Sequence, residues 1–333
     1  MADLEERLKT FLQSRSPADG IVTLHPDAST RGYFRIPWNG ASAVACVYPN
    51  RLDPALGNYV DETGLFLASG LPVAEIIDLD VELSIVLQED LGDRIVRDAL
   101  SIAGPQKADE LMNEAITMIA RIQAATPLAY ERDSIASRLR FDIEKLTWEL
   151  NYFKEHYFTT LRHRPLSPSD DEALTREFLG ISTELETCAA VLCHRDFHSA
   201  NLMIDPAGRL RIIDHQDARI GSVAYDLVSL LLDRVNALPD PAWLQEKKAV
   251  FLKQRAEYGL AAIDGETFDH EFDLQTIQRC LKAAGTFSYQ SAVRGKEHFV
   301  PFIDPMFEAS LAASERLQRF PVLRDVLERE TAF

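Results

Sequence analysis

The stretch "CHRDFHSANLMI", residues 193–204, places two histidines, an arginine, an aspartate and an asparagine beside apolar runs. Polar groups this dense are costly to bury unless each has a partner or a task. The neighbouring runs "AAVLC" and "NLMI" indicate short strands, and "DPAGR" followed by "LRIID" indicates a turn and a third strand. The polar stretch is therefore predicted to be a loop between strands, and loops on a rigid scaffold are where chemistry usually sits.

The polar residues of this stretch follow the spacing H-R-D-x-x-x-x-N, with Asp196 and Asn201 at two of its positions. Asp214 follows 18 residues after Asp196, at the end of a predicted strand. Phosphoryl transfer needs one carboxylate that orients the attacking hydroxyl, and an asparagine and a second carboxylate that hold Mg²⁺ against the phosphates. The pattern predicts Asp196 in the first role, as the catalytic residue, and Asn201 and Asp214 as the metal ligands.

Two other interpretations compete with phosphoryl transfer. A histidine close to an aspartate is often only part of a satisfied loop network, and "DPAGR" on its own is an ordinary hairpin turn. His194, Asp196 and His198 could instead bind a transition metal for hydrolysis. The complete string with a second acidic strand end favours phosphoryl transfer, because no further His, Cys or carboxylate cluster in the sequence completes a metal site.

The composition narrows the range of partners and compartments. With 35 Lys and Arg against 52 Asp and Glu, the 333-residue chain has a formal net charge of −17. Such a chain repels nucleic-acid phosphates and anionic lipid, so we expect neither nucleic acid nor membrane as a partner. The four scattered cysteines, an amphipathic N-terminus unlike a signal peptide and the absence of any long apolar run favour a cytoplasmic protein. The sequence predicts no particular oligomeric state, and a monomer is one option.

The apolar pattern changes along the chain and predicts two lobes. Before residue 90, strand-like runs accompany one helix near 54–69, and "WNG" marks a tight hairpin. Afterwards the spacing becomes helical, interrupted only by the strands around the polar loop. We predict an α+β, bilobal fold with a nucleotide-binding lobe at 1–89 and a helical lobe with the catalytic loop and substrate site at 90–333. Its helices are expected near 105–125, 134–156, 170–187, 241–260, 270–290 and 305–318.

These motifs resemble those of the aminoglycoside phosphotransferase family, small-molecule kinases with a protein-kinase-like fold. "LCHRDFHSANLMI" and "LRIIDHQDARIGSVAYDLVSLL" are similar to its catalytic and metal-binding segments, and the likeness covers nearly the whole chain. The resemblance implies ATP and Mg²⁺ as cofactors. "VLQEDLGD" resembles the inter-lobe strand of the family, so the backbone around Gln88, Glu89 and Asp90 is expected to meet the adenine. Asp226 in "AYDL" resembles an internal residue that braces the catalytic loop.

Three segments resemble one branch of this family, the bacterial kinases that phosphorylate the anomeric hydroxyl of N-acetylmuramate and N-acetylglucosamine in cell-wall recycling. They are "HPDASTRGYFRI", "IDHQDA" and "IQRCLKAAGTF" with the "RGK" that follows. The branch implies an amino sugar as the small-molecule substrate, and Asp233, Arg234 and Tyr289 are candidates for its pocket by position. An aminoglycoside or a choline-like alcohol is an alternative acceptor. A catalytically weak nucleotide-binding module is a third hypothesis.

The chain departs from the family at one position. A strand lysine usually contacts the nucleotide phosphates and pairs with a helix glutamate, but "SAVACVYP" has Cys46 there, and no lysine occurs from residue 10 to 106. Glu62 lies on the expected helix, where an exposed side chain is at least as good an interpretation as a paired one. Arg31 and Arg35 are the substitute cations that we expect to bind the phosphates, with solvated strand ends as the alternative.

Overall fold

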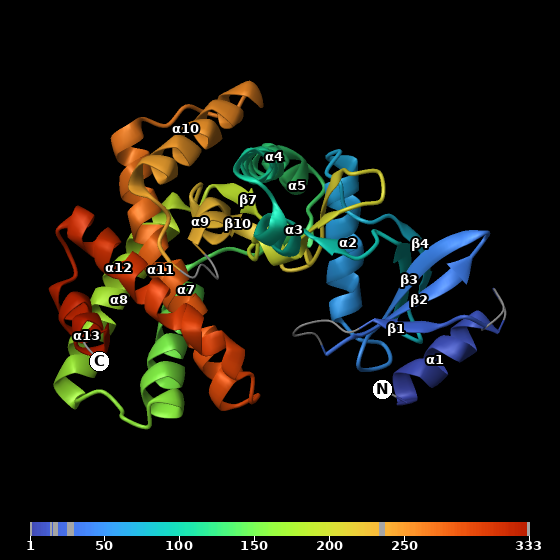
Figure 1. Cartoon of the computed structure of the whole chain (residues 1–333), viewed down its shortest axis with the longest axis horizontal. Coiled ribbons are helices and arrows are strands. Elements are labelled where there is room, and N and C mark those ends of the chain that lie inside the picture. Colours follow the sequence, from blue (N-terminus) through green and yellow to red (C-terminus); the bar gives the residue numbers. More distant parts are fainter. Residues whose placement is uncertain (1, 14, 16–18, 25–29, 233–236, 332–333) are drawn as a thin grey trace. The chain divides into compact units, whose positions relative to one another are not determined.

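The computed structural model of the chain describes residues 2–13, 15, 19–24, 30–232 and 237–331 (Figure 1). An antiparallel sheet near the N-terminus and a mostly helical remainder confirm the predicted α+β class. The lobe boundary after residue 89 stays a prediction. By compactness the chain divides into two units, the first made of Met1–Ala108, Leu128–Ile135 and Ser199–Ala218, and the second of Asp109–Pro127, Ala136–His198 and Arg219–Phe333.

The core of the first unit is a five-stranded antiparallel sheet in the order β1–β2–β3–β5–β4. The predicted hairpin is confirmed, because Trp38 pairs with Ala41, and Asn39 and Gly40 between them have φ angles of 48° and 82°. Asparagine and glycine adopt this left-handed conformation readily, and it matches the twist of the strands. The elements are α1 (Ala2–Leu12), β1 (Val22–Leu24), β2 (Gly32–Trp38), β3 (Ala41–Val47), α2 (Ala55–Ala68), β4 (Ile76–Asp80) and β5 (Ile85–Glu89).

Different helices cover the two faces of this sheet (Figure 1). Apolar residues of α1 at helical spacing pack on the face formed by alternate residues of β2, β3 and β5. On the other face, Leu56 and Tyr59 of α2 pack with Cys46 and Val86. The Cys46 side chain therefore points toward α2. The α1 residues in the first cluster are Leu4, Leu8, Phe11 and Leu12.

The strands around the polar loop belong to two separate sheets. In the first unit, β8 (Leu202–Ile204) pairs with both β9 (Leu210–Ile212) and β6 (Arg94–Ile95). In the second unit, β7 (Val191–Cys193) pairs with β10 (Arg219–Gly221). The strand order around the loop is as predicted, but the sequence does not predict β6 or β10, because two or three residues are too few for an alternating pattern.

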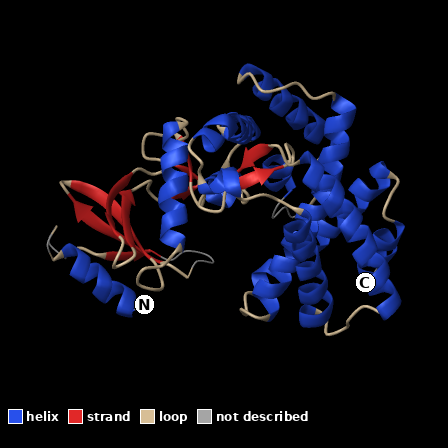
Figure 2. Ribbon diagram, turned by 180° about the vertical axis from the view of Figure 1, so that it is seen from behind, coloured by secondary structure: helices blue, strands red, loops and turns tan. Residues whose placement is uncertain are grey.

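Helices make up nearly all of the second unit (Figure 2). The longest, α11, packs against α7, η1, α9 and α12 and buries most of its residues, so it organises the unit. No helix in the described ranges is long and apolar enough to cross a membrane. The remaining elements of the chain are α3 (Val96–Ile102), α4 (Pro105–Ala124), α5 (Thr126–Glu131), α6 (Ile135–Arg138), α7 (Ile143–Phe153), the π-helix η1 (Lys154–Leu161), α8 (Pro168–Cys188), the 3₁₀ turn η2 (Ser199–Asn201), α9 (Tyr225–Leu232), α10 (Pro241–Glu257), α11 (Gly265–Ala292), η3 (Glu297–Phe302), α12 (Ile303–Leu317) and α13 (Pro321–Thr331).

Candidate active site

The polar loop after β7 is held by Asp226, in the first turn of α9. The fully buried Asp226 carboxylate accepts the backbone N–H of His194 at 2.7 Å and that of Arg195 at 3.0 Å. Burial raises the pKa of this carboxyl. Arg195 has a φ angle of 86°, a conformation that a residue with a side chain keeps only where its surroundings enforce it. These bonds confirm the predicted bracing role of Asp226.

The same loop carries Asp196, whose carboxylate meets two cations of α11. Arg279 Nη2 and Lys282 Nζ each donate to Asp196 Oδ1 at 3.1 Å. About a quarter of the Asp196 side chain, 26%, stays exposed. Burial alone would raise the pKa of the Asp196 carboxyl, but the attraction of Lys282 and Arg279 outweighs it and holds the pKa well below its ordinary value. The carboxylate is therefore charged at neutral pH, as the predicted role requires.

Arg279 and Lys282 are the residues near Asp196 that sequence reasoning missed. Both lie in "IQRCLKAAGTF", and their three-residue spacing places them on one face of a helix. That spacing was the available signal. The sequence contains no information on which loop this face would meet, because α11 lies far along the chain from the catalytic loop.

The two predicted metal ligands lie in the first unit, at one end of the β8–β9 hairpin. The Asn201 carbonyl accepts the N–H of Ile213 at 3.1 Å, which brings Asn201 beside the chain that leads into Asp214. Asp214 has a φ angle of 63°, and 41% of its side chain is exposed. Gln216 Nε2 and Arg31 Nη2 donate to Asp214 Oδ1 at 2.9 and 3.1 Å. The structure thus brings together Asn201, Asp214 and the predicted cation Arg31.

His215 anchors the segment after β9 to α2. Its buried ring accepts or donates a hydrogen bond at Nε2 with Thr63 Oγ1 at 2.8 Å, and it stacks on Phe66 with ring centroids 5.1 Å apart. Because successive residues after β9 point in different directions, the buried His215 leaves its neighbour Asp214 directed outward. In "IDHQDA", His215 is therefore a buried structural residue, and the adjacent Asp214 is an accessible carboxylate.

The chemistry of this end of the hairpin fits Mg²⁺ bound with a nucleotide. Asn201 and Asp214 offer oxygen donors, and Mg²⁺ usually takes one or two carboxylates and completes its shell with water and substrate phosphates. Among the residues that the structure describes, no group of three or more His, Cys, Asp and Glu side chains could hold a metal by itself. His194, Asp196 and His198 do not form such a group.

The position of the usual strand lysine is occupied by a buried thiol. Cys46 is 3% exposed, and burial raises its pKa to about 11, so it carries no charge at neutral pH. The guanidinium of Arg31 lies over the rings of Tyr33 and Tyr48, 5.7 and 5.6 Å from their centroids. Arg31 is thus no solvated strand end. The alternative of an exposed Glu62 is wrong, because Glu62 is completely buried on α2.

The segment predicted to meet adenine is held by side-chain contacts within the first unit. Gln88 Oε1 accepts the Tyr59 hydroxyl at 2.5 Å, and Glu89 Oε1 accepts Arg211 Nη1 at 2.8 Å. Asp90 Oδ2 accepts Arg35 Nε at 2.7 Å. Arg35 also donates to Asp93 Oδ1 at 2.8 Å. Like Arg31, Arg35 is therefore bound to carboxylates. The roles of these residues in nucleotide binding stay predictions.

Of the three sugar-pocket candidates, Asp233 and Arg234 lie outside the described residues. Tyr289 lies on α11, and its ring contacts that of His156 with centroids 5.0 Å apart. The C-terminal end of α11 thus makes an aromatic contact with η1. A role of Tyr289 in sugar binding stays a prediction.

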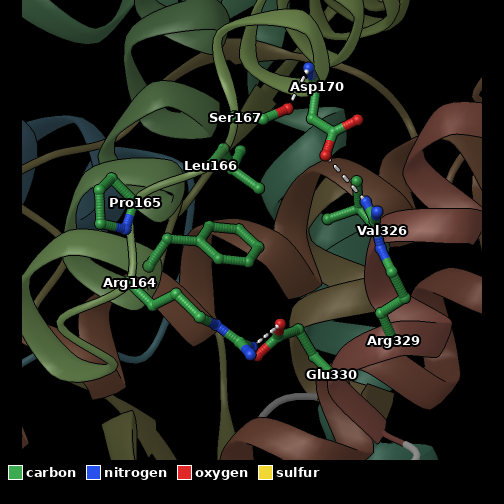
Figure 3. A pocket seen from close by; sticks show the side chains of 9 residues that line it. Arg164, Pro165, Leu166, Ser167, Asp170, Val326, Arg329 and Glu330 are labelled. Atoms are coloured by element: carbon green, nitrogen blue, oxygen red, sulfur yellow. Dashed lines mark hydrogen bonds and ion pairs between the residues drawn. The ribbon is translucent and has the colours of Figure 1, made fainter.

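A cavity of about 500 Å³ lies elsewhere in the second unit, beside the start of α8 and along α13 (Figure 3). Its charged side chains pair with one another, Arg164 with Glu330 and Arg329 with Asp170 (Figure 3). The lining includes none of the predicted catalytic or metal-binding residues. We therefore assign this cavity no part in the candidate active site.

Three features together define a phosphotransferase with a protein-kinase-like fold. They are the antiparallel sheet, the H-R-D-x-x-x-x-N loop braced by Asp226, and the hairpin that leads to Asp214. Residues 20–263 match the family described as the phosphotransferase enzyme family, APH, and the chain belongs to that family. It is therefore a phosphotransferase enzyme, as the sequence predicted.

Relatives of known name cover nearly the full length of the chain. The chain is 27% identical to the N-acetylmuramate/N-acetylglucosamine kinase of Neisseria meningitidis serogroup B, with 98% of both proteins covered. It is 28% identical to the kinase of that name from Pseudomonas aeruginosa, with 93% of this chain and 88% of that protein covered.

Solved structures share the fold at lower sequence identity. A microcompartment-associated aminopropanol kinase aligns with a TM-score of 0.62 and 15% identity over 94% of this chain and 96% of that chain. The choline kinase LicA of Streptococcus pneumoniae aligns with a TM-score of 0.59 and 12% identity over 94% of this chain and 97% of that chain. The protein-kinase-like fold predicted from the sequence is confirmed.

Proposed function

We propose that this protein transfers the γ-phosphate of ATP to the anomeric hydroxyl of an N-acetyl amino sugar, N-acetylmuramate or N-acetylglucosamine, in cell-wall recycling. The names of the two full-length relatives support the choice of acceptor. The observation that carries the reaction class is Asp196, a charged and partly exposed carboxylate on a braced loop of the H-R-D-x-x-x-x-N type.

In this proposal Asp196 orients the acceptor hydroxyl toward the γ-phosphorus. The acceptor oxygen forms a new bond to phosphorus, and the bond from phosphorus to the bridging oxygen of ATP breaks, with its electron pair leaving on ADP. In a loose transition state the hydroxyl keeps its proton until the new bond is largely formed, when the oxygen becomes strongly acidic. A carboxylate of low pKa, such as Asp196, can accept the proton at that stage and release it to water.

An anomeric hydroxyl suits this arrangement. It is more acidic than an ordinary alcohol, so a carboxylate that is only a weak base is sufficient to assist its attack. The acceptor class and the low pKa of Asp196 are therefore consistent with each other.

Asn201 and Asp214 would hold Mg²⁺, which neutralises charge on the β- and γ-phosphates when it is bound. Arg31 and Arg35 would add cationic support in place of the strand lysine. Both arginines now bind carboxylates, Arg31 that of Asp214 and Arg35 those of Asp90 and Asp93. On nucleotide binding, Arg31 would exchange the half-exposed Asp214 for a phosphate oxygen, which frees that carboxylate for the metal.

The experiment that tests this function measures ADP release from ATP and Mg²⁺ without an acceptor and with a panel of acceptors. The panel contains N-acetylmuramate, N-acetylglucosamine, choline and an aminoglycoside. The methyl glycoside of N-acetylglucosamine is the matched control, because only its anomeric hydroxyl is blocked. We expect turnover with both free amino sugars and none with the methyl glycoside. Turnover confined to choline or the aminoglycoside, or equal turnover of the methyl glycoside, contradicts the proposal.

A further inference from the structure

Two cations from one helix converge on a single oxygen of Asp196. Arg279 and Lys282 lie three residues apart on α11, and both nitrogens are 3.1 Å from Oδ1. A second bond orients the arginine, because its Nη2 also donates to Ser229 Oγ of α9 at 2.9 Å. The carboxylate thus meets cations whose positions are set by two helices of the same unit.

This arrangement is costly unless the carboxylate is present. Arg279 is only 3% exposed and the Lys282 side chain 15%, so both charges have lost most of their water. Burial lowers the pKa of Lys282, and repulsion from Arg279 lowers it further. Two adjacent buried cations persist when a buried anion compensates them. The contact of Asp196 with Arg279 and Lys282 is therefore a largely desolvated ion pair and not a surface ion pair.

We propose that Arg279 and Lys282 are a positioning pair for Asp196, which holds Oδ1 so that Oδ2 accepts the hydrogen bond of the acceptor hydroxyl. The inference rests on the proposed role of Asp196 in the transfer. Arg195 and His198, which also act on this carboxylate, belong to its own loop, and the Tyr225 hydroxyl of α9 interacts with it as well. The pair from α11 therefore ties the orientation of the loop carboxylate to the helical scaffold, and it keeps the carboxylate charged while phosphates approach.

A kinetic double-mutant cycle tests whether Lys282 acts through Asp196. Lys282→Met should lower kcat by about 10- to 100-fold, the size of effect expected when a reacting group is misplaced. The KM for ATP should stay within about twofold, since the lysine acts on the acceptor side. In an Asp196→Asn background the same substitution should cost less than about threefold, because residues that act as a unit are not additive. Lys282→Arg should restore most of the loss.

Lys248→Met is the matched control. Lys248 Nζ of α10 donates to Asp269 Oδ1 of α11 at 2.9 Å, and its side chain is 5% exposed, so this substitution also removes a buried lysine that pairs with an aspartate. Its effect on kcat should be small and the same in both backgrounds. A Lys282→Met loss that persists undiminished in the Asp196→Asn background overturns the proposal, because the lysine would then act on the phosphoryl group directly. An unchanged kcat overturns it as well.

The melting temperatures of the four proteins of the Lys282 cycle give a second readout that needs no substrate. These proteins are the wild type, Lys282→Met, Asp196→Asn and the double variant. Lys282→Met should lower the melting temperature more in the native background than in the Asp196→Asn background, since the ion pair is already weakened in the latter. If Lys282→Met does not fold, Arg279→Lys replaces it in both cycles. Failure of the proposed function is seen separately, as a wild-type protein that phosphorylates no amino sugar. Equal melting shifts in both backgrounds contradict the positioning pair itself.

Discussion

Replacing Asp226 with asparagine tests whether the catalytic loop depends on one buried carboxylate. Asp226 lies on α9, and its carboxylate accepts the backbone N–H groups of His194 and Arg195 in the loop. Arg195 sits at a φ angle of 86° immediately before Asp196. The carboxylate thus holds the strained residue that directs the catalytic side chain.

The expected magnitude follows from these two bonds. Asparagine keeps one oxygen acceptor and turns its NH₂ group toward the second backbone N–H. One hydrogen bond to a charged group, about 1.5–3 kcal/mol, is lost, and a buried donor without a partner adds about 1 kcal/mol. The free energy of unfolding should therefore fall by about 2–4 kcal/mol, and Tm by about 4–16 °C for a unit of this size. We expect kcat to fall about 100-fold, because Asp196 moves when Arg195 relaxes.

Thermal melting and steady-state kinetics on the same preparation provide the assay. Asp273→Asn is the matched control, since Asp273 is also a buried aspartate of the second unit, and Arg316 Nε lies 3.1 and 3.0 Å from its two oxygens. The control should also lose stability, because it weakens the ion pair of a buried carboxylate with a half-exposed arginine, without a large change in kcat. Two results would refute the reasoning. One is a lowered Tm of Asp226→Asn with near-native kcat, and the other is a large loss of kcat at unchanged Tm.

Four substitutions test the remaining roles. Asp214→Asn should abolish Mg²⁺-supported turnover at an unchanged melting temperature, because a neutral amide cannot offset phosphate charge through the ion; near-native turnover would remove Asp214 from the site. Asp196→Asn should lower kcat by roughly 10²–10⁴, the range of general acid–base groups, and a raised KM for ATP at constant kcat would make it a binding residue instead. Arg35→Ala should raise the KM for ATP, while Cys46→Ala should leave the steady-state kinetics nearly unchanged. The opposite result would show that the phosphate contact lies at the strand position of Cys46 and not at Arg35.

Residues close together in sequence were predictable where local rules determine their structure. Asn39 and Gly40 formed the expected hairpin, because two consecutive left-handed residues favour these side chains. The strands β7, β8 and β9 around the polar loop were likewise predictable, and the roles of Asp196, Asn201 and Asp214 stay predictions.

Contacts between distant segments were not predictable from the same patterns. The Arg279–Asp196 pair joins residues 83 positions apart, and an amphipathic pattern shows which helix face is polar but not what it meets. For Glu62 an exposed side chain was at least as good an interpretation as a paired one, because charged residues usually are exposed, yet Glu62 is buried on α2. The assignment of β7 and β8 to different sheets depends on the pairing of β7 with β10, and strands of three residues have no periodicity from which to infer that partner.

The central claim is that this phosphotransferase phosphorylates the anomeric position of an N-acetyl amino sugar. Phosphorus NMR of the product formed from ATP, Mg²⁺ and N-acetylglucosamine tests it most directly, because a 1-phosphate couples to the anomeric proton. We predict a single phosphate ester resonance with that coupling, and a far weaker one after the same reaction time with the Asp196→Asn enzyme. A phosphate ester coupled to the exocyclic methylene protons or to another ring proton would contradict the claim.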